Sequence, residues 1–233
     1  MTLYSLISEL RNHGKIIFNS DDILEYSHIS KNSVNKYTYR LNKSYNVFKI
    51  ERGEYSLTDD PFIVASQIVF PGYISFDSAL YIHNLLSQVI NIINIATPIR
   101  KKNIIFNSTP IRFVHMNPDL MFGYKKMRKD DSYIFLADVE KTIIDILYRP
   151  DISSISSILD IPVNRLNKTR LKGYSRALTI EAVRRRLGYI TDYMGIDLGI
   201  TVENNTVYKL NPYNNKKGKY VAKWKIYDNA VEY

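Results

Sequence analysis

A change of hydrophobic period within residues 30–57 constrains the fold of this chain more than any other feature of its sequence. The first half of the stretch repeats apolar or small residues every three or four positions, as one face of a helix does. The second half contains two short strand-like runs, at residues 47–50 and 55–57, with a tight turn around Gly53 between them. We therefore expect a helix followed directly by a β-hairpin. The inward stripe of that helix would consist of Val34, Tyr37, Thr38, Leu41 and Tyr45.

The opposite side of the expected helix is lined by long hydrogen-bond donors, and further basic residues flank it. Between Lys31 and Arg52 there are six Lys or Arg residues and one acid, Glu51. Such side chains can reach the phosphates and base edges of DNA. A solvated charged face is the ordinary alternative, but here basic and amide groups line one face with no acid between them. The candidate DNA-binding residues are Lys31, Asn32, Asn35, Lys36, Tyr39, Arg40, Lys43, Lys49 and Arg52.

The residues before this stretch complete an ordered set of elements. Residues 3–27 contain an amphipathic helix that Gly14 ends, a short strand, and a second helix that Asn19 and Ser20 can cap. The order helix, strand, helix, helix, hairpin is that of a winged helix-turn-helix. We therefore expect a winged helix-turn-helix DNA-binding domain over residues 1–58.

Residues 60–233 are expected to form a larger mixed α/β domain, so the whole chain is predicted to be an α+β protein of two domains. An acid followed by Pro61 marks the boundary, because acids cap helices and proline suits the first helical position. Turn signals, such as Thr109-Pro110, separate the expected strands. Asp138 is expected to cap a strong helix that presents Glu140 and Lys141 to solvent. The expected strands lie at residues 89–97, 104–107, 111–116, 121–125, 133–137, 207–210 and 220–227, and the expected helices at residues 62–70, 76–83, 138–150 and, in several pieces, 151–195.

The composition is that of an ordinary folded protein and favours a polyanionic partner. Of 233 residues, 45% are hydrophobic and 24% charged, and the net charge is +9. Division at residue 58 gives 8 basic and 6 acidic residues (+2) before it, and 24 and 17 (+7) after it. No apolar run reaches membrane-spanning length, no signal peptide is evident, and no cysteine is present. We expect a cytoplasmic protein that binds no membrane.

Residue patterns that could support catalysis are missing or have a simpler explanation. Asp138 is explained as a helix cap, and Glu140 points away from the face that Asp138 can share with Asp145. Pro118-Asp119 is not followed by the acid-x-lysine pattern of restriction-type nucleases. The four histidines are scattered, and the glycines do not cluster into a phosphate-binding loop. We therefore expect no enzymatic activity, no catalytic residue, no cofactor and no metal.

Basic clusters recur in the larger domain. Two of them form a second candidate basic surface: Lys125, Lys126, Arg128, Arg184, Arg185 and Arg186. Each cluster by itself could equally be a solvated loop or face, but the excess of +7 favours contact of at least one with nucleic acid. Trp224 and the 19 tyrosines are interpreted as core and strand residues rather than as base-stacking platforms.

An ordered set of landmarks in the larger domain points to a family. They are residues 61–66 (PFIVAS), 73–83 (YISFDSALYIH), 96–98 (ATP), 122–124 (FGY) and 137–145 (ADVEKTIID), with weaker ones at 186–189 (RLGY) and 224–226 (WKI). Their order and spacing closely resemble the AbiEi-type antitoxins, the transcriptional-regulator halves of type IV toxin–antitoxin modules of abortive infection. The resemblance weakens after Pro150. The family usually has glycine where this chain has Asn84, a position expected to end a helix in the left-handed conformation, for which asparagine is next best.

The resemblance implies a sequence-specific repressor that autoregulates its operon, contributes to antiviral defence and counteracts a nucleotidyltransferase-like toxin encoded nearby. Such antitoxins need not form a stable complex with the toxin, and the resemblance also implies a homodimer on inverted repeats. We accordingly expect the N-terminal domain to bind operator DNA and the second basic surface to take part in neutralisation. The alternative is a stand-alone transcriptional regulator, or a defence-associated protein-interaction module without a toxin partner.

Overall fold

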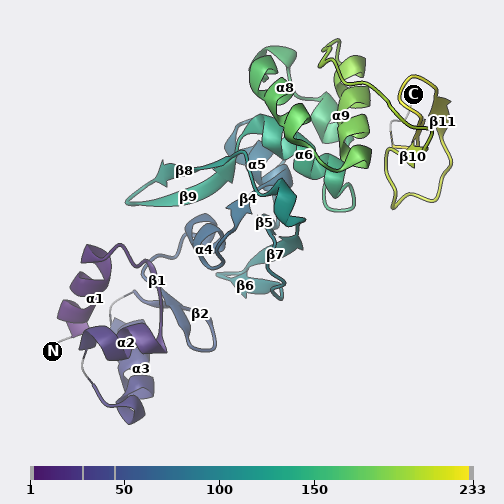
Figure 1. Ribbon diagram of the computed structural model, residues 1–233. Coiled ribbons are helices and arrows are strands. Elements are labelled where there is room, and N and C mark those ends of the chain that lie inside the picture. The colour runs from purple at the N-terminus through teal and green to yellow at the C-terminus, as the bar shows by residue number, and fades with distance from the viewer. Residues whose placement is uncertain (1–2, 28, 45, 231–233) are drawn as a thin grey trace.

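The structure of the chain is a computed structural model that describes residues 3–27, 29–44 and 46–230 (Figure 1). Over these residues the chain is an α+β protein with three β-sheets. The N-terminal unit (residues 3–57) contains α1 (Leu3–Asn12), β1 (Ile17–Asn19), α2 (Ser20–Ser27), the 3₁₀ helix η1 (Lys31–Ser33), α3 (Val34–Ser44), β2 (Phe48–Glu51) and β3 (Glu54–Ser56).

The larger unit (residues 60–230) alternates helices and strands and ends in a small sheet. Its elements are α4 (Pro61–Gln67), β4 (Tyr73–Ile74), α5 (Phe76–Ile82), β5 (Ile93–Thr97), β6 (Ile104–Phe106), β7 (Thr109–His115), η2 (Pro118–Leu120), β8 (Tyr124–Lys129), β9 (Ser132–Ala137), α6 (Val139–Tyr148), α7 (Ser156–Leu159), η3 (Val163–Arg165), α8 (Lys168–Ala177), α9 (Glu181–Tyr193), β10 (Tyr208–Lys209), β11 (Lys219–Val221) and β12 (Ile226–Asp228).

The N-terminal unit folds around a small apolar core between its helices and an antiparallel sheet of order β1-β3-β2. Leu6 and Leu10 of α1 are fully buried, and Phe18 of β1 is 1% exposed. Asn19 ends β1 and caps α2, because its Oδ1 accepts a hydrogen bond from the backbone N–H of Asp21 at 2.8 Å. The order of elements is the one that the residue pattern predicts.

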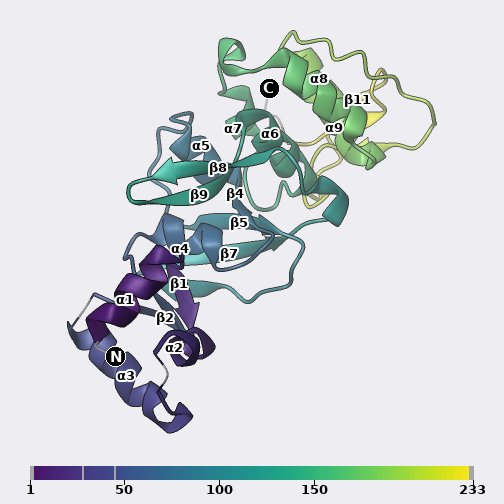
Figure 2. The same cartoon turned by 60° about the vertical axis from the view of Figure 1, so that its left-hand side comes forward.

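The larger unit is built on a six-stranded mixed sheet of order β6-β7-β5-β4-β9-β8. β5 runs parallel to β7 and β4 parallel to β9, whereas the other neighbouring strands are antiparallel. Its strands bury Ile74, Ile95, Ile111 and Leu136 in one large core. In both views α6, α8 and α9 lie at the end of this unit away from the N-terminal unit (Figures 1 and 2).

Positive φ angles mark both the end of α5 and the turn between β6 and β7, and of these two only the first lies where the sequence predicts it. Asn84 follows α5 with φ of +55°, which confirms the left-handed helix end. The predicted turn at Thr109-Pro110 is wrong, because both residues begin β7. The chain instead turns at Asn107 and Ser108, whose φ angles are +46° and +64°. Two successive left-handed residues match the twist of a tight hairpin, here between β6 and β7.

Several predicted elements have the wrong boundaries. The strand expected at residues 89–97 is β5, which begins only at Ile93, and the helix expected at residues 62–70 is α4, which ends at Gln67. The strand expected at residues 121–125 is β8, which starts later and includes the whole basic run up to Lys129. Paired with β9 at the sheet edge, that run can hold solvated charges in a regular strand. The strand expected at residues 220–227 is two strands, β11 and β12, because the chain turns before β12 at Lys225 with φ of +49°.

α6 confirms one prediction about its first turn and contradicts another. Asp138 is the cap, since its Oδ1 accepts from the backbone N–H of Lys141 at 2.8 Å. Glu140 and Lys141 are not on the surface: they are 2% and 0% exposed. α6 is covered by α5, α8 and α9 and by β9, so even its polar side is enclosed. Glu140 there accepts the backbone N–H of Asn167, the cap of α8, at 2.6 Å.

The β2–β3 hairpin joins the two units. Phe48 of β2 meets Phe106 of β6 edge to face, with ring centroids 6.5 Å apart. Ile50 packs into the large core, and Glu51 forms an ion pair with Lys101. The division into two domains at residue 58 stays a prediction, because the hairpin contributes to the packing of both units.

Candidate nucleic-acid interface

The outer face of α3 and of η1 before it carries exposed polar and basic side chains: Asn32, Lys36, Tyr39, Arg40 and Lys43. Tyr39 is 67% exposed although its ring is large and mostly apolar. α3 lies at the end of the N-terminal unit remote from the six-stranded sheet, so the larger unit does not cover this face (Figures 1 and 2). The side chains of Lys31 and Asn35, also predicted to bind DNA, lie outside the described residues, as does Tyr45, which is predicted to face inward.

Packing of the opposite face orients α3. Val34 and Thr38 are each 6% exposed and Leu41 is fully buried, as the helical period predicts. Burial of each apolar side chain contributes roughly 1.5–3 kcal/mol. After the helix, the side-chain amide of Asn42 donates to the backbone carbonyl of Val47 at 2.6 Å, which ties α3 to the start of the hairpin. The outward face is therefore the side that remains when the apolar stripe is buried.

The basic side chains of this region are free of carboxylate partners. Among the described residues, no carboxylate forms an ion pair with Lys36, Arg40, Lys43, Lys49 or Arg52. All five are exposed. An unpaired surface cation can neutralise a phosphate and release its counterion without first breaking an internal ion pair. The arrangement can thus bind a polyanion along α3 and the exposed side of the hairpin.

The tip of the hairpin is anchored by the acids on either side of its turn. Lys101 forms an ion pair with Glu51 and its ammonium lies 3.9 Å from the carboxylate of Glu54. Burial raises the pKa of Glu54, Lys101 opposes that shift, and the nearby Glu51 adds to it. Lys49 and Arg52 remain exposed beside the anchor. Sequence reasoning missed this contact because its two partners are 50 residues apart and Lys101 sits in a basic cluster.

The second candidate basic surface does not form one patch. Lys125, Lys126 and Arg128 are exposed on β8, the edge strand of the six-stranded sheet. They form no ion pair with a carboxylate in the described parts of the chain. Arg184 lies on α9 instead and is paired with Glu181 at 2.7 Å. The β8 residues therefore remain candidates, separately from α9.

Arg185 and Arg186 correct the expectation of a surface cluster, since they are 0% and 6% exposed. Arg185 pairs with Glu181 at 2.6 Å and donates to backbone carbonyls of the segment that follows α9. Arg186 donates to the carbonyls of Leu147 and Lys209 at 2.9 and 3.0 Å. Burial lowers the pKa of Arg186 to about 10, so its charge persists at neutral pH. A guanidinium can be buried in this way because its N–H groups find fixed acceptors.

A second charged network is sealed inside the larger unit. Lys141 forms an ion pair with Asp145, and the hydroxyls of Tyr73 and Ser75 donate to the same carboxylate at 3.1 and 2.7 Å. All four residues are 0% exposed. A solute cannot reach these groups without local opening, so the network links α6 to the sheet rather than presenting chemistry to a substrate.

Residues 3–27, 29–44 and 46–230 contain neither a cluster of metal-ligating side chains nor a membrane-spanning helix. No group of three or more His, Asp or Glu residues in that part is placed to hold a metal ion. None of its helices is both long enough and apolar enough to cross a membrane.

Of the residues predicted to bind nucleic acid, those on the outer face of α3, on the exposed side of the hairpin and on the β8 edge are thus accessible and cationic. Similarity to other proteins gives no independent assignment of these regions. No protein-family model matches the chain, and no curated protein sequence matches it.

Proposed function

We propose that the chain binds double-stranded operator DNA through the outer face of α3 and represses transcription from its own promoter. The observation that carries the proposal is the pattern of Lys36, Arg40 and Lys43, which are exposed on one helical face and unpaired with acids. The hydrogen-bonding side chain of Asn32 precedes them, and Tyr39 lies among them. Side chains of these types read base edges and phosphates when a helix lies in the major groove.

The N-terminal unit would then be a winged helix-turn-helix. This assignment is supported by the element order, by the short connection between α2 and α3, and by the β2–β3 hairpin that follows. In helix-turn-helix modules the second helix enters the major groove while the first crosses the backbone. The exposed Lys49 and Arg52 would contact phosphates beside that groove, at a position that the Glu51–Lys101 ion pair holds in place.

Binding to the region upstream of the gene tests this proposal. Replacement of both Lys36 and Arg40 by Ala should cost roughly 1–3 kcal/mol for each base-reading contact, and less for each phosphate contact. The matched control is Lys172→Ala with Arg176→Ala on α8. It also removes one exposed Lys and one exposed Arg that are four residues apart on a helix. Gel shifts at physiological salt measure both. Unchanged affinity of the α3 variant, or an equal loss in the α8 variant, would refute the assignment.

The hairpin is tested by the salt dependence of the same binding. Log affinity falls as log salt concentration rises, and Arg52→Ala should make this negative slope shallower by about 0.9 if Arg52 neutralises one phosphate. A slope identical to that of the wild-type protein would remove Arg52 from the interface.

We further propose that the chain is the antitoxin of a type IV toxin–antitoxin module, counteracting a nucleotidyltransferase-like toxin. The support is the ordered set of landmarks that resemble AbiEi-type antitoxins. Two landmark segments, residues 73–83 and 137–145, meet in space through the hydrogen bonds of Tyr73 and Ser75 to Asp145. Ser75 and Asp145 are 70 positions apart in the sequence, and residues that make such a contact are expected to occur together in proteins that share the fold.

Rescue of cells that express the neighbouring toxin gene tests the antitoxin role. The chain is supplied from a promoter that it does not control, so repression cannot contribute. The Lys36→Ala, Arg40→Ala variant should still rescue, whereas Lys125→Glu with Lys126→Glu should reduce rescue while thermal melts stay unchanged. Failure of the wild-type protein to rescue contradicts the role, and absence of a nucleotidyltransferase-like gene nearby would favour a stand-alone regulator. Arg185 and Arg186 are excluded from this test because their burial makes them structural.

A further inference from the structure

One side of the β8–β9 hairpin combines exposed cations with aromatic rings. Lys126 lies opposite Phe135 in the strand pairing, and Arg128 lies opposite Tyr133, so all four share one side of the sheet. The ammonium of Lys126 lies 3.6 Å from the centre of the Tyr133 ring. Phe70, just after α4, adds a ring whose centroid is 6.1 Å from that of Phe135. We call these five residues the aromatic–basic groove.

The exposure of the rings is the unusual feature of the groove. Phe70 is 72% exposed although it is next to Val69, which is 7% exposed and in the core. Tyr133 and Phe135 are half-buried, and their centroids are 5.5 Å apart. They line a cleft of about 340 Å³ between the larger unit and the segment that leads into β1, with Phe70 at its wall. A run of three rings in contact, one of them mostly in solvent, offers apolar faces to a flat ligand.

The charge around the rings selects the ligand. Lys126 and Arg128 are exposed, and no carboxylate of the described residues pairs with either. The lining of the cleft includes no acidic residue. A ligand with flat apolar groups and regularly spaced negative charges satisfies both the rings and the cations. That description fits an unpaired nucleic-acid strand, whose bases stack on aromatic side chains while its phosphates meet Lys and Arg.

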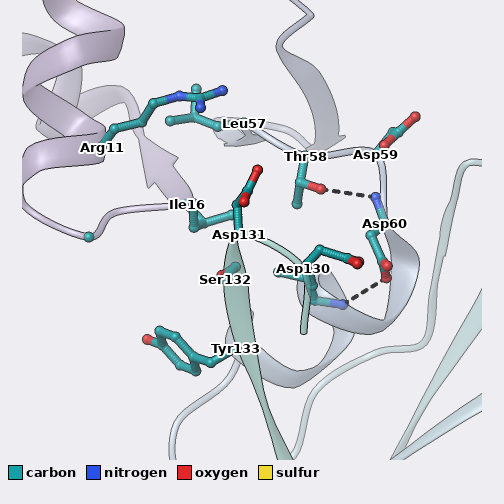
Figure 3. A pocket seen from close by; sticks show the side chains of 12 residues that line it. Arg11, Ile16, Leu57, Thr58, Asp59, Asp60, Asp130, Asp131, Ser132 and Tyr133 are labelled. Atoms are coloured by element: carbon teal, nitrogen blue, oxygen red, sulfur yellow. Dashed lines mark hydrogen bonds between the residues drawn. The ribbon is translucent and has the colours of Figure 1, made fainter. Parts of the chain in front are cut away.

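The groove is bounded by an acidic hollow. This neighbouring hollow, of about 520 Å³, shares Gly14, Ile16 and Tyr133 with the cleft. Figure 3 shows the four carboxylates that line it: Asp59, Asp60, Asp130 and Asp131. Asp60 and Asp130 form ion pairs with Lys129. Carboxylates repel phosphates, so a bound strand would extend from the rings toward Lys126 and not into the hollow.

We propose that the aromatic–basic groove binds single-stranded nucleic acid, with bases on Phe70, Tyr133 and Phe135 and phosphates on Lys126 and Arg128. Duplex DNA does not suit the rings, because its bases are already stacked and paired. The groove lies on the larger unit and α3 at the far end of the N-terminal unit, so the two surfaces act separately (Figures 1 and 2). The proposal therefore does not depend on operator binding by α3.

Fluorescence anisotropy with labelled 12-nucleotide RNA and DNA strands and a 12-base-pair duplex tests the groove in the full chain. All variants are made in the Lys36→Ala, Arg40→Ala background, which suppresses binding at α3. Phe70→Ala should weaken binding of the single strands roughly 5- to 150-fold, the range for loss of one base-stacking contact. Phe70→Trp should restore it. Tyr4→Ala is the control for removal of an exposed ring, because Tyr4 is 71% exposed and lies on α1.

The cations are tested by salt dependence. Lys126→Ala should make the negative slope of log affinity against log salt concentration shallower by about 0.7, the value for one phosphate of a single strand. Lys125→Ala is the matched control, because Lys125 is exposed on the same strand but points to the other side of the sheet. Preference for RNA over DNA would indicate a contact with the 2′-hydroxyl. The proposal is overturned if the single strands do not bind, if only the duplex binds, or if Phe70→Ala and Tyr4→Ala have equal effects.

Discussion

Replacement of Lys141 by Met tests whether the ion pair beneath α6 is truly enclosed. In the structure Lys141 and Asp145 are both 0% exposed, and Asp145 also accepts hydrogen bonds from Tyr73 and Ser75. Burial disfavours the charged form and raises the pKa of Asp145, while Lys141 is the main group that opposes this shift. Removal of Lys141 therefore leaves a buried carboxylate without its counter-charge.

The buried position of Lys141 in the structure and the exposed position predicted from the sequence imply very different losses of stability when Lys141 is replaced. Breaking a buried ion pair by removing one partner costs about 3–5 kcal/mol. On the exposed helix surface predicted from sequence, the same pair at i, i+4 would contribute about 0.3–0.5 kcal/mol. For a chain of this size each kcal/mol corresponds to roughly 2–4 °C in Tm, so the structure predicts a fall of about 6–20 °C. The double variant Lys141→Met, Asp145→Asn should recover much of the loss, because no charge stays buried and the amide oxygen still accepts from Tyr73 and Ser75.

Urea unfolding followed by tryptophan fluorescence measures these differences in the stability of the larger unit, which contains α6. The chain has a single tryptophan, Trp224, which is 5% exposed and packs on α9, the helix beside α6. Lys172→Met on the exposed side of α8 is the control and should change the free energy of unfolding by less than about 0.5 kcal/mol. A loss for Lys141→Met as small as that of the control would refute the buried pair. So would a double variant that is less stable than Lys141→Met alone.

Three further predictions concern packing, backbone conformation and pH. Gly188→Ala should destabilise the larger unit by about 1–3 kcal/mol and shift the tryptophan emission, because the new Cβ would lie 2.2 Å from the Trp224 ring; denaturant melts measure both. Asn84→Ala should cost about 1 kcal/mol and Asn84→Gly almost nothing in the same melts, because φ there is +55°; equal effects would contradict the left-handed helix end. Arg149 donates to both carboxylate oxygens of Asp151 and thereby lowers the pKa of that carboxyl in the folded protein. The stabilisation, roughly 0.5–1 kcal/mol, is then present above the ordinary pKa and lost as pH falls through the lowered one, so wild type and Asp151→Asn should differ in stability at pH 7 and converge as pH falls below the lowered pKa.

Local sequence patterns determined the elements of the N-terminal unit and several of their ends. The burial of Val34 and Leu41 and the cap at Asn19 follow from periodicity and backbone chemistry that act over four or five residues. The exposure of Lys36 and Arg40 follows from the same period, because the side opposite an apolar stripe faces solvent. These parts of the fold and of the candidate DNA interface could therefore be predicted without tertiary contacts.

Tertiary structure decided whether particular charged and aromatic side chains are buried or exposed, where the local sequence pattern does not determine this. Lys141 and Arg185 are in runs typical of solvated helix faces, yet both are buried because Asp145 and the segment after α9 supply acceptors. Phe70 is apolar and yet exposed, because the sheet directs Tyr133 and Phe135 to its side without covering it. A long side chain can be buried or solvated at similar cost if partners exist, and partners separated by tens of residues are brought together only by the fold.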